Sequence, residues 1–244
     1  MRVARFFIDA PLALGAPIEL PPRTAHHALR VLRLRGGDPI VLFNGTGGEF
    51  SAHLAINGSR VVAEIETSDT VERESPLAVT LVQAWVATDK LDWVIEKSVE
   101  LGVHSIVLTP AQRSVVRVTG DRLAKRLERL RELIVAACAQ CGRNRIPRIE
   151  AAPTLADALR TGRSGGSTGV LLEPNAAVRL SEAELSNRRL ALAVGPEGGF
   201  DNDELTLARQ LGYCAHRLGP RILRTETASL AALATLQAAA GDFC

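Results

Sequence analysis

Leu192-Ala-Val-Gly-Pro-Glu-Gly-Gly-Phe200 joins an apolar strand candidate to three glycines, a proline and one glutamate, and a helix is expected to follow from Asn202. In an open parallel sheet, ligands bind beyond the carboxyl ends of the strands. Glycines at such a position let the backbone approach a ligand closely, because they carry no Cβ. A tight strand-to-helix turn without a ligand explains the same letters. This stretch therefore predicts a strand end and leaves the ligand open.

A second stretch, Leu218-Gly-Pro-Arg-Ile-Leu-Arg-Thr-Glu-Thr-Ala228, also follows a predicted strand and leads into a helix. It carries two arginines and one glutamate beside apolar side chains. Two charged loops at the ends of two strands favour a cleft over two coincidental turns. Neither stretch fits GxxxxGK followed by Ser or Thr, or GxGxxG, so a loop that grips nucleotide phosphates is not indicated.

Strands and helices alternate through the last two thirds of the chain. Short runs rich in Val, Ile and Leu predict the strands, and apolar residues three and four apart predict the helices. The expected strands are Leu77–Val86, Val103–Leu108, Gly169–Glu173, Arg189–Val194 and Cys214–Leu218. The expected helices are one from Asp89 that is closed by Gly102, then Gly120–Gln140, Asn202–Leu211 and Thr225–Ala240. This alternation predicts an α/β fold with a parallel sheet.

The N-terminal part of the chain predicts a small barrel-like module instead. Glycines in Asn44–Gly48 and Asn57-Gly58 supply the positive φ angles that tight connections need. Thr24–Leu34 predicts a short helix with Thr24 as its N-cap. Four short, β-branched runs between turn residues predict strands at Val3–Ile8, Pro39–Phe43, Glu49–Ile56 and Arg60–Glu66.

Composition sets outer bounds on the fold and the location. The 244 residues suffice for two domains, which we place at residues 1–73 and 74–244. Hydrophobic residues make up 46% and charged residues 23%, as in ordinary globular proteins. We expect a cytoplasmic protein, because no apolar run reaches the roughly 18 residues of a membrane span and the N-terminus lacks a signal-peptide pattern. Cys138-Ala-Gln-Cys141 has CxxC spacing but stands alone in a predicted helix, so we expect no metal.

Basic residues are unevenly distributed, although the net charge is only +2. Residues 113–148 hold ten Lys and Arg against three Asp and Glu. Residues 23–35 hold four arginines, two histidines and no acid. Basic surfaces of this kind suit a polyanion such as RNA. Solvated helix faces explain the same charges equally well.

The two glycine-bearing stretches resemble the signature loops of the RsmE family of SPOUT (trefoil-knotted) methyltransferases. Further matches, in chain order, are His26–Arg33, Leu42–Glu49, Asp89–Lys97 with Glu100–Gly102, Arg113–Val116 and Ala136–Arg143. Two places depart from the family pattern. Ala87-Thr88 stands where a lysine and a small residue are usual, and Cys141 replaces a serine.

The resemblance implies a fold, a reaction and partners. The implied fold is an N-terminal PUA-like β-barrel followed by a SPOUT α/β domain with a deep trefoil knot. The implied reaction is methylation of N3 of one uridine in small-subunit (16S) ribosomal RNA, with S-adenosylmethionine as the methyl donor. The implied assembly is a homodimer with the active site at the subunit interface. We expect ribosomal RNA or the small ribosomal subunit as the partner, and no membrane.

The resemblance also implies a cofactor site. We expect S-adenosylmethionine to contact residues of the two signature loops and one preceding strand end: Leu172, Val194, Gly195, Pro196, Glu197, Gly198, Gly199, Leu218, Gly219, Ile222, Leu223, Arg224, Thr227 and Ala228.

Three charged residues are candidates for catalysis. N3 of uridine carries a proton and attacks a methyl group poorly until that proton is lost. A guanidinium stays charged and offers a fork of donors, so Arg224 suits the developing negative charge. Either Glu197 or Glu226 could accept the proton or orient Arg224, and the sequence does not separate these roles. Glu226 could equally serve the start of a helix.

Candidate RNA contacts come from both basic regions: His26, His27, Arg30, Arg33, Arg35, Gln140 and Arg143. Arg30 and Arg33 share a face of the predicted helix. The histidines could instead pack under the barrel. Gln140 and Arg143 could contact RNA, line the cofactor pocket or cap a helix end.

Two other functions remain open from the residues alone. A nucleotide-dependent enzyme would need a lysine beside the glycines, which is absent here. An RNA-binding protein without catalysis would bind RNA but not S-adenosylmethionine. That alternative gives no reason for Glu197 and Arg224 to stand beside glycine loops.

Overall fold

The computed structural model describes residues 3–58, 60–185 and 187–243. The chain forms two compact units. The first comprises Met1–Glu74 together with Cys138–Ile146, and the second comprises Ser75–Ala137 and Pro147–Cys244. We call Cys138–Ile146 the returning segment, because the chain comes back to the first unit there; nothing in the sequence indicated this return.

The first unit is built on a five-stranded sheet in the order β1-β3-β4-β5-β2. Strands β1 and β3 are parallel, and the other neighbours are antiparallel. Gly45, Gly47, Gly48 and Gly58 adopt positive φ, as predicted for the turns around β4. The strands are β1 (Ala4–Phe7), β2 (Pro17–Glu19), β3 (Pro39–Phe43), β4 (Glu49–Asn57) and β5 (Arg60–Asp69).

The short helical segment of this unit differs from the prediction. It consists of α1 (Pro22–His26), which continues into a π-helical turn over His27–Val31. The N-cap is Pro21, so the predicted N-cap at Thr24 is wrong. Pro22 explains the earlier start, because proline fits the first helical position, where its missing N–H is not needed.

The second unit is an α/β domain with a seven-stranded sheet in which every neighbouring pair is parallel, as predicted. The order is β10-β12-β9-β11-β6-β7-β8. Strand β9 therefore lies between β11 and β12, so the loops after these three strands leave the sheet side by side. The strands are β6 (Ala78–Ala84), β7 (Ser105–Thr109), β8 (Arg148–Ala151), β9 (Thr168–Leu172), β10 (Val178–Arg179), β11 (Arg189–Val194) and β12 (Tyr213–Arg217).

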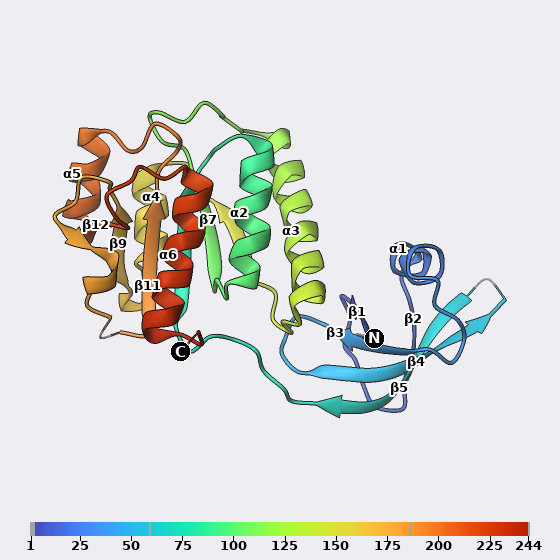
Figure 1. The fold of residues 1–244 in the computed structure, drawn as a ribbon. Helices are drawn as coiled ribbons and strands as arrows, with labels where there is room; N and C mark the ends of the chain where they lie inside the picture. The colour runs from blue at the N-terminus through green and yellow to red at the C-terminus, as the bar shows by residue number, and fades with distance from the viewer. Residues whose placement is uncertain (1–2, 59, 186, 244) are drawn as a thin grey trace. The chain divides into compact units, whose positions relative to one another are not determined.

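Helices cover this sheet on both faces. Helices α2 and α6 lie side by side on one face, and α4 packs on β6, β7 and β11 from the other (Figure 1). Four apolar side chains of α2 are fully buried, as the helical spacing predicted: Leu91, Val94, Ile95 and Val99. The helices are α2 (Thr88–Glu100), α3 (Asp121–Cys141), α4 (Leu155–Gly162), α5 (Asn202–Gln210) and α6 (Thr225–Ala240), with single turns at Ser164–Gly166 and Leu180–Glu182.

Neither a metal cluster nor a membrane-spanning helix is found in the described part of the chain. Its helices lack the combined length and hydrophobicity that crossing a bilayer requires. Its His, Cys, Asp and Glu side chains nowhere gather in a group of three or more that could hold a metal ion. Cys138, Cys141 and Cys214 are free thiols, whereas Cys244 lies outside the described residues.

Candidate active site

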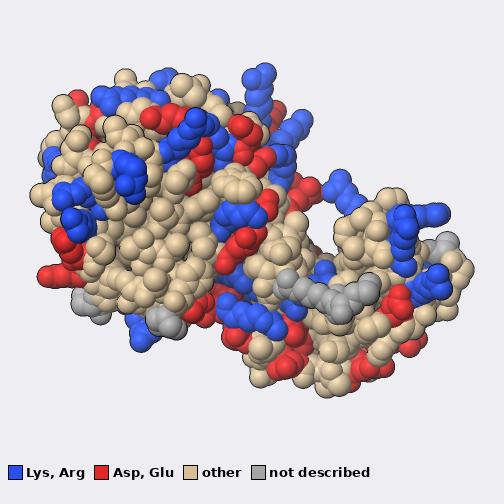
Figure 2. Space-filling view, viewed as in Figure 1, with Lys and Arg blue, Asp and Glu red and all other residues tan. Residues whose placement is uncertain are grey.

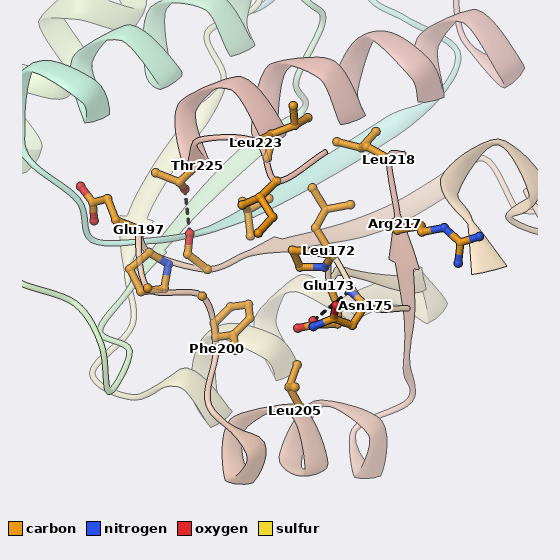
Figure 3. Close-up of a pocket in the computed structure, with 18 of the residues that line it drawn as sticks. Leu172, Glu173, Asn175, Glu197, Phe200, Leu205, Arg217, Leu218, Leu223 and Thr225 are labelled. Carbon is orange, nitrogen blue, oxygen red and sulfur yellow. Dashed lines mark hydrogen bonds between the residues drawn. The ribbon is translucent and has the colours of Figure 1, made fainter. Parts of the chain in front are cut away.

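A cavity of about 470 Å³ opens where β9, β11 and β12 end (Figure 3). The two glycine-bearing loops form walls of this cavity, and the residues after β9 lie between them. Twelve of the fourteen predicted cofactor contacts line it: Leu172, Val194, Gly195, Pro196, Glu197, Gly198, Gly199, Leu218, Gly219, Ile222, Leu223 and Ala228. The other two, Arg224 and Thr227, are exposed and do not line the cavity.

Glycines in the first loop are required by close packing. A Cβ on Gly195 would lie 3.0 Å from the backbone nitrogen of Phe200. A Cβ on Gly198 would lie 3.1 Å from Cβ of Arg113, and Gly199 has a positive φ of 69°. Larger residues would therefore displace the loop, so its path along the cavity depends on these glycines.

A buried polar network ties the two loops together. Thr225 Oγ1, at the start of α6, donates to the carbonyl oxygen of Gly195 at 2.7 Å. Gln83 on β6 donates to the same hydroxyl at 3.3 Å, and Ser229 donates to Gln83 Oε1 at 2.6 Å. Gln83 and Ser229 are fully buried, and Thr225 is nearly so. Satisfied networks of this kind fix geometry, because breaking one bond leaves a buried polar group unpaired.

Glu197 pairs with Lys90 of α2 rather than with Arg224. The Lys90 Nζ lies 3.0 Å from Glu197 Oε1. Desolvation raises the pKa of Glu197, but hydrogen bonds from backbone N–H groups and from Lys90 outweigh it and hold the pKa below its ordinary value. Figure 3 shows the carboxylate directed away from the other labelled side chains. Such a carboxylate is a weak base at neutral pH and is suited to anchoring the loop.

The remaining two catalytic candidates stand at the start of α6. Arg224 is the N-cap residue, with an extended backbone and an exposed side chain. Glu226 lies in the first turn of this helix, where its charge is favourable to the helix dipole. Its Oε2 atom is shielded from solvent and has no hydrogen-bond partner among the described residues. An unpaired carboxylate oxygen of this kind is free to accept a proton or a guanidinium hydrogen.

Several polar residues of the cavity were missed by the sequence analysis. Glu173 and Asn175 follow β9, and the Glu173 carboxylate accepts a hydrogen bond from the Asn175 backbone at 3.1 Å. His216 and Arg217 stand at the end of β12 and also line the cavity. Strand β9 was predicted, but its place between β11 and β12 was not. Knowledge of the strand order would have placed these residues at the site.

Comparison with known proteins identifies the chain. The family model for the RNA methyltransferase domain matches residues 73–237, and the model for the RNA methyltransferase PUA domain matches residues 20–66. Ribosomal RNA small subunit methyltransferase E of Buchnera aphidicola subsp. Schizaphis graminum is 32% identical, over 99% of this chain and 98% of the relative. The chain belongs to the ribosomal RNA small subunit methyltransferase E family. The family predicted from the two loops is thereby confirmed.

Two solved methyltransferase structures agree with this fold over at least 99% of the chain. The enzyme from Neisseria gonorrhoeae, bound to S-adenosyl methionine, is 38% identical with a TM-score of 0.94, and the match covers 100% of both chains. A methyltransferase from Legionella pneumophila, in complex with the same cofactor, is 34% identical with a TM-score of 0.93, over 99% of this chain and 100% of its own. The α/β fold with an N-terminal PUA-like unit is confirmed, whereas the trefoil knot stays a prediction.

Arg143, a candidate RNA contact, is committed to an ion pair within the first unit. Its guanidinium is only 5% exposed and forms a two-pronged pair with the Glu74 carboxylate, through Nε at 3.0 Å and through Nη2. Arg145 pairs with Glu72 at 2.8 Å. The returning segment is therefore held by carboxylates. The ion pair of Arg143 was not among its predicted roles, and an RNA contact by Arg143 stays a prediction. Gln140, at the end of α3, is exposed.

Further contacts hold the buried residues of the returning segment in the first unit. Asn144 donates to Glu49 at 3.2 Å, and Arg5 contacts both of these side chains. Burial raises the pKa of the Cys138 thiol to about 12. Because the thiolate is the reactive and metal-binding form of cysteine, this thiol is inert at neutral pH.

The other RNA candidates are all exposed on the first unit: His26, His27, Arg30, Arg33 and Arg35. His27 also contacts the Phe6 ring edge-on, with ring centroids 6.2 Å apart, so it combines exposure with packing on the sheet. Arg33 adopts a left-handed backbone, with φ of 56°. Val31 and Leu32 between these residues are 59% and 43% exposed. This surface keeps its positive charge and apolar atoms open to a partner.

Proposed function

We propose that this chain methylates N3 of a uridine in small-subunit ribosomal RNA, with S-adenosylmethionine as the donor. The observation that carries the proposal is the cavity enclosed by the two loops that the family resemblance singled out. Relatives that share the whole length of the chain bear the name ribosomal RNA small subunit methyltransferase E. Two full-length structural relatives hold the cofactor.

The residues of the cavity suit this cofactor. A volume of about 470 Å³ lies within the roughly 300–1,000 Å³ of small-molecule sites. Leu172, Leu218 and Leu223 supply apolar surface for an adenine ring (Figure 3). A Cβ on Gly219 would meet nothing within 4 Å, so the backbone is open to a ligand there. Glu173 supplies a carboxylate that suits ribose hydroxyls or the positive charge of the donor.

We assign the charged residues distinct roles in this reaction. The bound cofactor supplies an electrophilic methyl group. Arg224 stabilises the uridine anion through its guanidinium, which stays charged and offers parallel donors. Glu226 accepts the N3 proton or orients Arg224, because its Oε2 has no partner among the described residues. Glu197 acts as a positioning residue that Lys90 holds in place.

We propose that the enzyme works as a homodimer, with the active site completed at the subunit interface. Helix α6 carries one charged residue, Glu226, in its first turn. Figure 2 shows a broad surface without Lys, Arg, Asp or Glu over this helix. A surface that is depleted of charge suits the centre of an interface. We also propose that the second unit contains the deep trefoil knot that the family resemblance implies. We propose a cytoplasmic location, because ribosomal RNA is modified there.

Calorimetric titration of the wild-type protein tests this function. We expect S-adenosylmethionine to bind with one site per chain, whereas ATP and NAD should give no heat. If ATP or NAD gives heat of binding and S-adenosylmethionine gives none, the result would favour a nucleotide-dependent enzyme. RNA binding without any heat from S-adenosylmethionine would leave an RNA-binding protein and would overturn the methyltransferase proposal.

A further inference from the structure

Two loops that border the cavity carry arginines without carboxylate partners. Arg113 belongs to the loop after β7, and Arg221 belongs to the loop after β12; both line the cavity. Nη1 of Arg113 donates to the carbonyl oxygen of Gly198 at 2.8 Å. Neither arginine forms an ion pair with any residue that the structure describes, and Arg221 forms no hydrogen bond with one either.

Three other arginines of the second unit are held by carboxylates. Arg129 of α3 pairs with Asp92 of α2, and Arg148 and Arg160 pair with nearby carboxylates. Three arginines line the cavity, Arg113, Arg217 and Arg221, against two glutamates, Glu173 and Glu197, and Glu197 is paired with Lys90. The cavity lining therefore carries an excess of positive charge, which favours an anion.

An apolar side chain stands beside these arginines. Ile222 lines the cavity and is 87% exposed, more than any other large hydrophobic residue in the described ranges. Val115, two residues after Arg113, is the next most exposed at 79%. Single exposed apolar residues are common, but here the two most exposed ones fall on the two loops that carry Arg113 and Arg221. An aliphatic side chain can pack on the face of a base that has left its stack.

We propose that Arg113 and Arg221 bind RNA phosphates on either side of the nucleotide that enters the cavity, and that Ile222 packs against its base. We call these three residues the rim. The proposal rests on the proposed function, because it takes the ligand of the cavity mouth to be the RNA substrate. Guanidinium groups bind phosphate through paired hydrogen bonds, and such contacts fix the position of a strand without reading its sequence. The rim is thus a single-strand binding site on the second unit.

Salt-dependent RNA binding tests the rim. A short single-stranded oligouridylate is titrated into the full-length protein, saturated with S-adenosylmethionine, at a series of salt concentrations. Each lost phosphate contact should lower the slope of log K against log salt by about 0.7 and weaken binding about fivefold at 0.1 M salt. Arg221→Ala should show this loss once, and the double variant Arg113→Ala/Arg221→Ala should show it twice.

A matched control removes the same charge from another exposed surface of the second unit. Lys125 and Arg131 are exposed on α3. Lys125→Ala/Arg131→Ala should leave affinity and slope close to wild type. An equal loss in this control would show a general charge effect and would overturn the proposal. Ile222→Ala should weaken binding while the salt slope stays at the wild-type value, because the lost contact is apolar.

Other results separate this proposal from the function on which it rests. If Arg221→Ala weakens S-adenosylmethionine binding and spares RNA binding, the arginine belongs to the cofactor site and the rim is wrong. If Arg221→Ala changes the molecular mass in light scattering, the rim is a subunit contact. In either case the wild-type protein still binds the cofactor. If the proposed function itself is wrong, the wild-type protein should not bind S-adenosylmethionine.

Discussion

The rim and the returning segment use the same side chain in opposite ways. Arg143 of the returning segment follows a glycine at the end of a helix, and Arg221 follows Gly219-Pro220 at the end of a strand. Arg143 is buried in a pair with Glu74, whereas Arg221 is exposed and has no carboxylate partner among the described residues. Carboxylates from distant parts of the chain decide which arginine is structural and which is available to a ligand.

The two regions also differ in what they should contribute. A paired, buried guanidinium contributes to folding, because its removal leaves a carboxylate without a partner. An exposed, unpaired guanidinium contributes little to folding and remains available for phosphate. Substitutions in the two regions should therefore separate stability from activity.

Arg224→Ala should have the largest effect on activity. Removing a group that stabilises developing negative charge costs about 10²–10³-fold in rate. Because Arg224 is exposed and forms no ion pair with a described residue, thermal stability should stay at the wild-type value. Methyl incorporation into ribosomal RNA measures the rate. Arg224→Lys is the control that keeps the charge but not the fork, and wild-type activity in Arg224→Ala would show that another group stabilises the anion.

Arg143→Ala should have the largest effect on stability. The pair with Glu74 is mostly buried, with side chains 5% and 22% exposed. Breaking a buried pair from one side costs about 3 kcal/mol. Urea unfolding measures this loss, and binding of oligouridylate by the folded variant should keep the wild-type salt slope. Unchanged stability together with a lower salt slope would indicate that Arg143 contacts RNA.

Arg30→Ala/Arg33→Ala tests the exposed basic surface of the first unit. Each arginine that contacts a phosphate should lower the salt slope by about 0.7 on a single strand or about 0.9 on a duplex. Stability should change by less than about 0.5 kcal/mol, as for other surface substitutions. A slope equal to that of the wild type would place the RNA away from this surface.

We expect Glu49→Gln to have the smallest effect, seen as a change in how the free energy of unfolding depends on acid pH. Glu49 pairs with Arg5 and Arg73. Desolvation raises its pKa, but hydrogen bonds from Arg73, Arg5 and Asn144 outweigh it and lower the pKa to about 2. A carboxyl whose pKa is lower in the folded state stabilises the fold above its unfolded value, near 4.5, and loses that contribution as the pH falls toward 2.

Unfolding free energies measured across pH 2–5 test this expectation. The wild-type protein should lose stability in this window, and Glu49→Gln should lose less because it cannot be protonated there. Equal acid sensitivity in the two proteins would show that Glu49 does not carry the effect.

Local patterns predicted much of the second unit. The bounds of β11 and α6 agree with the predicted Arg189–Val194 and Thr225–Ala240, because long apolar periodicity and clear turn residues mark them. Strand β8 and helix α4 were missed, since β8 has only four residues and α4 only eight. Short elements carry too little periodicity to stand out from loops.

The site was predicted in part for the same reason. The two glycine loops were recognisable because their sequence is local, and they do line one cavity. Glu173 and His216 were missed because their placement depends on strand order, and the burial of Arg143 was missed because Glu74 lies far away in the sequence. Long-range pairing decides these features, and no single stretch of sequence contains it.

Mass mapping of nucleosides tests the central claim most directly. Small ribosomal subunits that lack the modification are incubated with the protein and isotopically labelled S-adenosylmethionine, and the digested ribosomal RNA is analysed. We expect a labelled methyl group on N3 of a single uridine, and no such label with Arg224→Ala. Label on another atom or base, or no label with the wild-type protein, would contradict the proposed function.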